Sequence, residues 1–175
     1  MTAPTAANAE TSTSLARPLW ARILLIVVAL LESLGIVSAV FVLSGDLSEI
    51  PGSGFGGLIA AAALMLRPLL AIVALVFAVR GRLRSAIIAL AAAVLMHWLD
   101  LLPSVVLHGL EFGGLGDLYS SAHFLISPVV ALAAIVLAWR NSHRLGLAAI
   151  LVSLPTVADW LSVVAFAIGI AIYGF

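Results

Sequence analysis

Five long apolar stretches dominate the chain, and they leave little room for any fold other than a bundle of membrane helices. They run over residues 19–43, 58–79, 85–107, 118–139 and 145–173, and the fourth begins at Leu118 or as late as His123. A helix needs about 20 predominantly apolar residues to cross about 30 Å of hydrocarbon. Hydrophobic residues form 64% of the chain, against about 45–50% in soluble domains. We therefore predict an all-α integral membrane protein with a bundle of five transmembrane helices.

The charges outside these stretches predict a domain organisation and an orientation. Residues 1–16 are rich in Ala, Thr and Ser, which predicts a disordered polar tail before a single five-helix domain at residues 17–175. Seven of the eight arginines fall at one set of helix ends: Arg17, Arg22, Arg80, Arg82, Arg84, Arg140 and Arg144. By the positive-inside rule, the N-terminus is cytoplasmic and the C-terminus is outside.

Two further points concern location. The Ala-, Leu-, Val- and Arg-rich composition is typical of a high-GC bacterial genome, so we expect a multi-pass protein of the bacterial cytoplasmic membrane. Alternatively, the first stretch is a cleaved signal peptide, because Val37-Ser38-Ala39 resembles a small-residue cleavage site. The other four spans would keep their orientation in either case.

The composition also excludes several function classes. The chain has no cysteine and no lysine, which rules out disulfides, thiolate metal sites, cysteine nucleophiles and Schiff-base or P-loop lysines. The net charge is zero and the arginines are scattered, so nucleic acid is not an expected partner. We expect the lipid bilayer as the main partner, with a second copy or a membrane complex as a further one, and no bound cofactor.

The second pair of stretches resembles the third pair at an offset of 60 residues. The matches are Pro68 with Pro128, Arg80 with Arg140, Arg84 with Arg144, and Ala71, Ala74, Val76, Ala78 and Ala89 with Ala131, Ala134, Val136, Ala138 and Ala149. The pairs would then be parallel repeats about an axis along the membrane normal. Alternatively, the two hairpins resemble each other without duplication, because any short membrane hairpin with cytoplasmic arginines is under the same sequence constraints. Arg67 matches Ser127 and His97 matches Val157, so the copies differ where chemistry would occur.

Ionisable residues interrupt four of the five stretches at similar depth. They are Glu32, Arg67, His97, Asp100 and Asp159, each 12 to 15 residues from the cytoplasmic end of its stretch. At 1.5 Å per residue they fall in a slab roughly 5 Å thick, about 18–22 Å from the boundary. A charge at mid-membrane costs roughly 2.5–3.5 kcal/mol on insertion scales, so such residues usually face the bundle interior and are functional.

Charge counting in this layer favours the binding of a proton or a cation. Three carboxylates face one arginine, and Glu32 is the first candidate to pair with Arg67, in a geometry that allows two parallel hydrogen bonds. His97 and Asp100 are three residues apart on one helix face and can interact. At least one acid then lacks a fixed cation and must take a proton or hold a cation. The indole N–H groups of Trp98 and Trp160 could donate to these carboxylates. The alternative is a static network that fixes helix packing.

A polar stripe leads outward from the layer. His97, Asp100, Ser104, His108 and Glu111 recur at spacings of three and four, so they share one face of a helix. We predict a solvated path through Ser104, His108 and Glu111. Each of the last four stretches also contains one proline, which frees a backbone carbonyl that can bind a cation or permit a hinge.

The histidines and serines also allow the hypotheses of a metal, haem or catalytic site. His108 and His123 are expected near the outer face beside Glu111 and Asp117, where they could bind zinc or copper. A bis-histidine haem would need His97 and a histidine of a second protomer. No G-x-S-x-G sequence surrounds a membrane serine, so we do not expect an enzyme.

Three functional hypotheses follow. The first is a small permease-like protein for a proton, cation or small solute, with Glu32, Asp100 and Asp159 as exchangeable acids, Arg67 as counter-charge and His97 as proton relay. The second is a non-catalytic structural or assembly subunit of a larger membrane complex. The third is a membrane protein that binds a metal or haem.

Overall fold

The computed structural model describes residues 19–36, 55–110, 112–140 and 142–174, and these form an all-α bundle. Its five α-helices and one short 3-10 helix are α1 (Leu19–Ser33), α3 (Phe55–Val79), α4 (Leu83–His108), α5 (Leu115–Arg140), η3 (Ser142–Arg144) and α6 (Leu145–Tyr173). The predicted N-terminal tail, the end of the first predicted span and Glu111 lie outside these residues.

Four of the helices have the length and composition of membrane spans. These are α3, α4, α5 and α6, whose apolar segments cover 24 to 29 residues. Helix α1 covers 15 residues and is not among them. The apolar helices indicate a lipid bilayer environment, and the chain is a multi-pass membrane protein by helix length and composition.

The predicted boundaries agree closely with these helices. The second predicted span ends where α3 ends, at Val79, and the fifth coincides with α6. Helix α5 begins at Leu115, before either predicted start, because its first turn is polar. Asp117 lies in that first turn, where a carboxylate interacts favourably with the helix dipole. Each of these four helices contains one proline, as predicted: Pro68, Pro103, Pro128 and Pro155.

Helix α4 is the centre of the bundle. It packs against each of the other four described α-helices, and eight residues of its first half are buried, from Leu83 to Val94. Such burial requires a broad apolar face on the helix rather than a narrow apolar stripe.

The buried core consists mostly of alanines, while large apolar side chains cover the outside. Small residues let membrane helices approach closely, since lipid tails are as apolar as leucine and only packing distinguishes the two contacts. The alanine-rich segments at residues 60–63 and 91–93 contribute Ala60, Ala63, Ala91 and Ala93 to this core. The 60-residue offset has a counterpart in burial: Ala71, Ala74 and Ala78 of α3 and Ala131, Ala134 and Ala138 of α5 are all buried.

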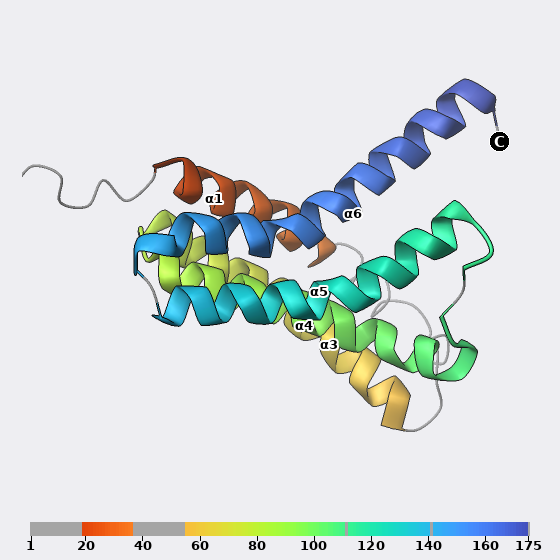
Figure 1. Cartoon of the computed structure of the whole chain (residues 1–175), viewed down its shortest axis with the longest axis horizontal. Helices are drawn as coiled ribbons and strands as arrows, with labels where there is room; N and C mark the ends of the chain where they lie inside the picture. The colour runs from red at the N-terminus through yellow and green to blue at the C-terminus, as the bar shows by residue number, and fades with distance from the viewer. Residues whose placement is uncertain (1–18, 37–54, 111, 141, 175) are drawn as a thin grey trace, which may run out of the picture.

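The two ends of the bundle differ (Figure 1). At one end, the start of α1, the α3–α4 turn and the α5–α6 turn gather. There the side chain of Arg22 donates to the backbone carbonyls of Ala78 and Val79 at the end of α3, and Trp20 lies so close to Gly146 that a Cβ on this glycine would come within 2.8 Å of its ring. At the other end the helices spread apart, and the second half of α6, from Leu161 onward, is largely exposed. A tightly packed half therefore adjoins an open half.

Candidate functional site

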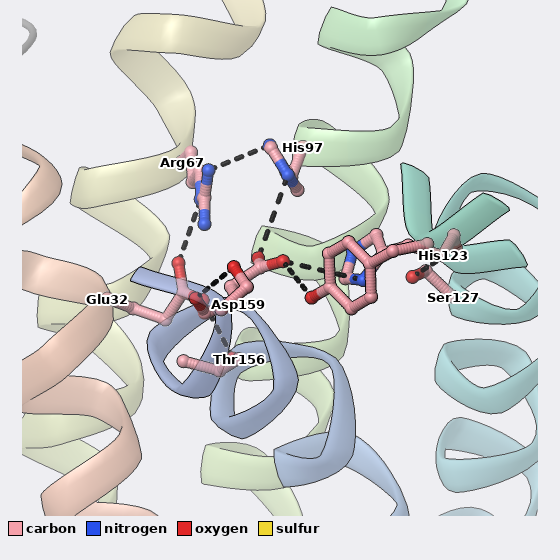
Figure 2. A network of polar contacts seen from close by, with 9 residues as sticks. Glu32, Arg67, His97, His123, Ser127, Thr156 and Asp159 are labelled. Carbon is pink, nitrogen blue, oxygen red and sulfur yellow. Dashed lines mark hydrogen bonds and ion pairs between the residues drawn. The ribbon is translucent and has the colours of Figure 1, made fainter. Parts of the chain in front are cut away.

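A connected set of polar side chains lies in the middle of the bundle, and each described α-helix contributes to it (Figure 2). The members are Glu32 of α1, Arg67 of α3, His97 of α4, Tyr119 and His123 of α5, and Thr156 and Asp159 of α6. We call this set the polar network. It joins elements up to 124 residues apart in the chain, so only the folded bundle assembles it.

The first half of the polar network is an ion pair reinforced by a hydroxyl. Arg67 Nε donates to Glu32 Oε2 at 2.8 Å, which is the pairing expected from the sequence. Thr156 Oγ1 donates to the other carboxylate oxygen, Oε1, at 2.7 Å. Glu32 is buried, with 3% of its side chain exposed, and Arg67 retains 29%. The two-pronged geometry expected from the sequence is not formed, since a single hydrogen bond joins the two side chains; Thr156 donates to the other oxygen of Glu32, and Nη1 of Arg67 faces His97.

The second half of the network surrounds Asp159. Tyr119 donates its hydroxyl to Asp159 Oδ1 at 3.1 Å. His97 Nε2 lies 3.8 Å from Oδ2, and His123 Nδ1 lies 3.4 Å from Oδ1. No arginine in the described part of the chain lies within ion-pair distance of Asp159, and the chain has no lysine. The carboxylate therefore faces two imidazoles and a phenol without a permanent positive partner.

His97 connects the two halves, and its contact with Arg67 fixes its tautomer. Arg67 Nη1 lies 2.7 Å from His97 Nδ1. Since a guanidinium can only donate, Nδ1 must accept this hydrogen bond. The ring proton of His97 therefore sits on Nε2, the nitrogen that faces Asp159.

His123 is buried but poorly satisfied. Its side chain is 8% exposed, and Nε2 has no hydrogen-bond partner among the described residues. The 3.4 Å separation of Nδ1 from Asp159 exceeds the usual 2.7–3.2 Å of an N–H···O hydrogen bond. Buried polar atoms normally have partners, so an orphaned imidazole nitrogen beside a carboxylate needs an explanation.

Two other predicted members of the layer stand apart from the network. Asp100 makes no hydrogen bond or ion pair with any residue that the structure describes, and its expected partner His97 contacts Arg67 and Asp159 instead. The expected indole donation from Trp98 is likewise not found within the described ranges. Its Nε1 is buried without a partner, and its ring stacks on Phe124 at 5.4 Å between centroids. Trp160 lies beside Glu32 and Asp159 in the wall of a cavity.

Two cavities flank the site. The first has a volume of about 220 Å³ and is lined by Glu32, Arg67 and Asp159 together with Leu31, Leu34, Gly35 and Trp160. The second, about 300 Å³, lies between α4 and α5 and includes the predicted path residues Ser104 and His108 with Asp117. His108 Nδ1 donates to the carbonyl of Ser104 at 3.1 Å. The polar network is therefore open to a cavity on one side, and the stripe of α4 borders a separate one.

The structure groups the histidines differently from the grouping predicted from the sequence. His123 was placed with His108 near the outer face, whereas the structure places it beside His97 and Asp159. His108 lies in the cavity wall between α4 and α5. Tyr119 and Thr156 are members of the polar network that were not predicted from the sequence. A usable signal existed for Tyr119, because Tyr119, His123 and Ser127 recur every four residues on one face of α5.

The chain matches no protein-family model, no curated protein and no solved structure.

Proposed function

We propose that this protein binds a small cation at the polar network and moves it across the bacterial cytoplasmic membrane, without catalysing a reaction. The observation that carries the proposal is the setting of Asp159. This carboxylate has no arginine at ion-pair distance among the described residues, and it lines a cavity of about 220 Å³. An acid placed at membrane depth without a fixed counter-charge gains strongly from a bound cation.

The two halves of the network have different roles in this proposal. Glu32 is held by both Arg67 and Thr156, so it fixes α1, α3 and α6 relative to one another rather than exchanging a cation. Asp159 is the acid that binds and releases the cation. His97 contacts both Asp159 and Arg67, so it links cation binding at Asp159 to Arg67. Asp100, which has no described partner, is a second acid that can bind and release the cation.

The shape of the bundle supports entry from one side. The helices gather at the end that carries the arginine-rich turns and spread at the other, while alanines fill the packed half. A cation would reach Asp159 from the open half through the cavity, with Ser104 and His108 lining a second polar route. Passage to the other side then requires the packed half to open, as in alternating access.

The proposed orientation places the arginine-rich turns in the cytoplasm, with five spans, a cytoplasmic N-terminus and the two hairpins as parallel repeats. The absence of cysteine allows single-cysteine labelling of the intact protein in cells. We expect Phe112→Cys, at an exposed site, to react with a membrane-impermeant maleimide. Arg82→Cys should react only after permeabilisation, and the reverse pattern would contradict the orientation.

Flux in liposomes tests the transport proposal. Purified protein is reconstituted in vesicles containing a pH-sensitive dye or a metal-sensitive dye, and a cation gradient is imposed. Wild-type vesicles should dissipate the gradient of at least one cation, and Asp159→Asn should abolish this while Asp100→Asn slows it. Ser153→Ala is the matched control on the same helix, because Ser153 donates only to the Ala149 carbonyl. Wild-type flux in both aspartate variants, or no flux at all, would refute the proposal.

A second candidate function is a non-transporting subunit of a larger membrane complex. The feature that favours it is the second half of α6, where large apolar residues including Leu161, Phe166 and Ile172 are more than half exposed. It predicts that mild extraction yields the protein with other subunits, and that charged substitutions on this half release them. A monodisperse protein without partners after such extraction would count against this function.

A further inference from the structure

We propose that the cation held at this site is a divalent transition metal, with zinc the best fit, bound by His97, His123 and Asp159. This inference rests on the proposed function and names its substrate class. The three side chains come from α4, α5 and α6 and offer one ligand atom each, all within 4.8 Å of one another. We call them the metal triad.

The spacing of the ligand atoms is close to what zinc requires. Zinc takes imidazole nitrogen and carboxylate oxygen at about 2.0–2.2 Å in a tetrahedral arrangement, which places ligand atoms about 3.4 Å apart. In the structure Asp159 Oδ1 lies 3.4 Å from His123 Nδ1, and Oδ2 lies 3.8 Å from His97 Nε2. Each imidazole nitrogen therefore already lies near one oxygen of Asp159. Because one ligand atom from each of the three side chains lies within 4.8 Å of the other two, a contraction of about 1 Å would bring one carboxylate oxygen and both nitrogens to the spacing of zinc ligands.

The donor set selects the class of ion. Two imidazoles and one carboxylate suit zinc and its first-row neighbours, whereas calcium and magnesium need six or more oxygen ligands. No thiolate competes, because the chain has no cysteine. A set of three protein ligands leaves the fourth position of zinc open, and Asp159 borders the cavity of about 220 Å³. An open position next to a cavity suits an ion that must enter and leave.

The burial of His123 is an independent observation. More than nine-tenths of its side chain is buried, yet Nε2 has no partner in the described residues and Nδ1 faces Asp159 at 3.4 Å. The protein thus leaves this imidazole unsatisfied next to a carboxylate. A metal ion bound at Nδ1 would use it, and the proton would then sit on Nε2, where no described donor stands in the way.

Arg67 competes with the metal for His97. In the structure Nδ1 of His97 accepts from Arg67, so the proton occupies Nε2, the nitrogen nearest Asp159. Ligation through Nε2 shifts the proton to Nδ1, where two donors would then face each other. Metal binding therefore requires Arg67 to release His97 while it keeps Glu32. This exchange would convert ion binding into a rearrangement between α3 and α4.

The direct test measures zinc binding to the full-length protein in nanodiscs, purified without a polyhistidine tag. We expect one zinc ion per chain by competition with a chromophoric chelator, and an absorption spectrum of tetrahedral cobalt when Co²⁺ replaces zinc. Both measurements use the wild-type protein, so they do not depend on the folding of a variant. A blank result in both would overturn the proposal.

Variants locate the site. His123→Asn and Asp159→Asn should weaken zinc binding more than tenfold, whereas His143→Asn, outside the metal triad, should leave it unchanged. Changes in zinc affinity of about tenfold or more are typical when the partner of a ligating histidine is altered, so we expect about tenfold tighter binding in Glu32→Gln/Arg67→Met, which removes the competing donor together with its counter-charge. Folding loss cannot produce tighter binding. Loss of zinc binding in His143→Asn, together with retained binding in His123→Asn, would show that zinc binds at another site.

The outcomes also separate this inference from the proposed function. Flux of another cation through a protein that binds no zinc would refute the metal site and leave transport standing. Zinc bound at the triad without flux of any cation would support the site and refute transport.

Discussion

The ion pair between Glu32 and Arg67 gives a prediction whose size can be worked out from burial. Its two members are unequally exposed, at 3% for the glutamate and 29% for the arginine. Arg67→Met leaves a buried carboxylate with only the hydroxyl of Thr156, and an orphaned buried charge of this kind costs about 3–5 kcal/mol. Glu32→Gln leaves an arginine that borders a cavity and can be rehydrated, so we expect a loss of about 1–2 kcal/mol.

The double variant distinguishes a coupled pair from two independent losses. Glu32→Gln/Arg67→Met removes both charges and leaves no orphaned buried carboxylate. With a coupling energy of about 2–3 kcal/mol between the two positions, we expect the double variant to be about 1 kcal/mol more stable than Arg67→Met alone, although still less stable than the wild type.

Unfolding by sodium dodecyl sulfate in mixed micelles, followed by circular dichroism, measures these free energies. Arg80→Met is the matched control, because Arg80 is exposed at the end of α3, and we expect a change below about 0.5 kcal/mol. Additive effects of the two substitutions would refute the reasoning, as would a larger loss from Glu32→Gln than from Arg67→Met.

Three further predictions concern packing, and the same unfolding measurement checks each of them. Gly146→Ala should destabilise by about 1–3 kcal/mol because its Cβ would meet Trp20 at 2.8 Å, whereas Gly169→Ala, with nothing within 4 Å, should be neutral or slightly stabilising; equal effects would contradict the close approach. Arg22→Gln should cost about 1–3 kcal/mol because it removes hydrogen bonds to two carbonyls at the end of α3, and an unchanged free energy of unfolding would show that these bonds do not form. Trp98→Phe should cost less than about 1 kcal/mol, because it removes a buried N–H without a described partner and so offsets the lost apolar area; a loss of several kcal/mol would indicate that the N–H is satisfied.

The helices could be predicted from the sequence because a bilayer demands long apolar segments, and the ends of α3 and α6 fell at the expected residues. The pairing of Glu32 with Arg67 could also be predicted, since both residues lie at similar depth and carry opposite charge. Depth follows from counting residues along a straight helix, so contacts that depend on depth alone are accessible to sequence reasoning.

The remaining contacts depend on how each helix is rotated about its own axis, which residue counting does not give. The side chain of His97 contacts Arg67 and Asp159 rather than Asp100, its expected partner. His123 was expected near the outer face because it follows a polar segment, yet α5 begins several residues earlier and carries it to the level of Asp159. Thr156 was overlooked because a threonine in an apolar stretch carries no charge to mark it.

The contribution of every described α-helix to one polar network has a consequence for biogenesis. The ribosome adds Glu32 first and Asp159 last, so each charged segment is synthesised before all of its partners exist. A chain that stops after Arg140 already contains both members of the ion pair but neither Thr156 nor Asp159. Until the last helix has been synthesised, His97 and His123 lack the carboxylate that lies between them in the bundle, so completion of α6 is the step that completes the polar network.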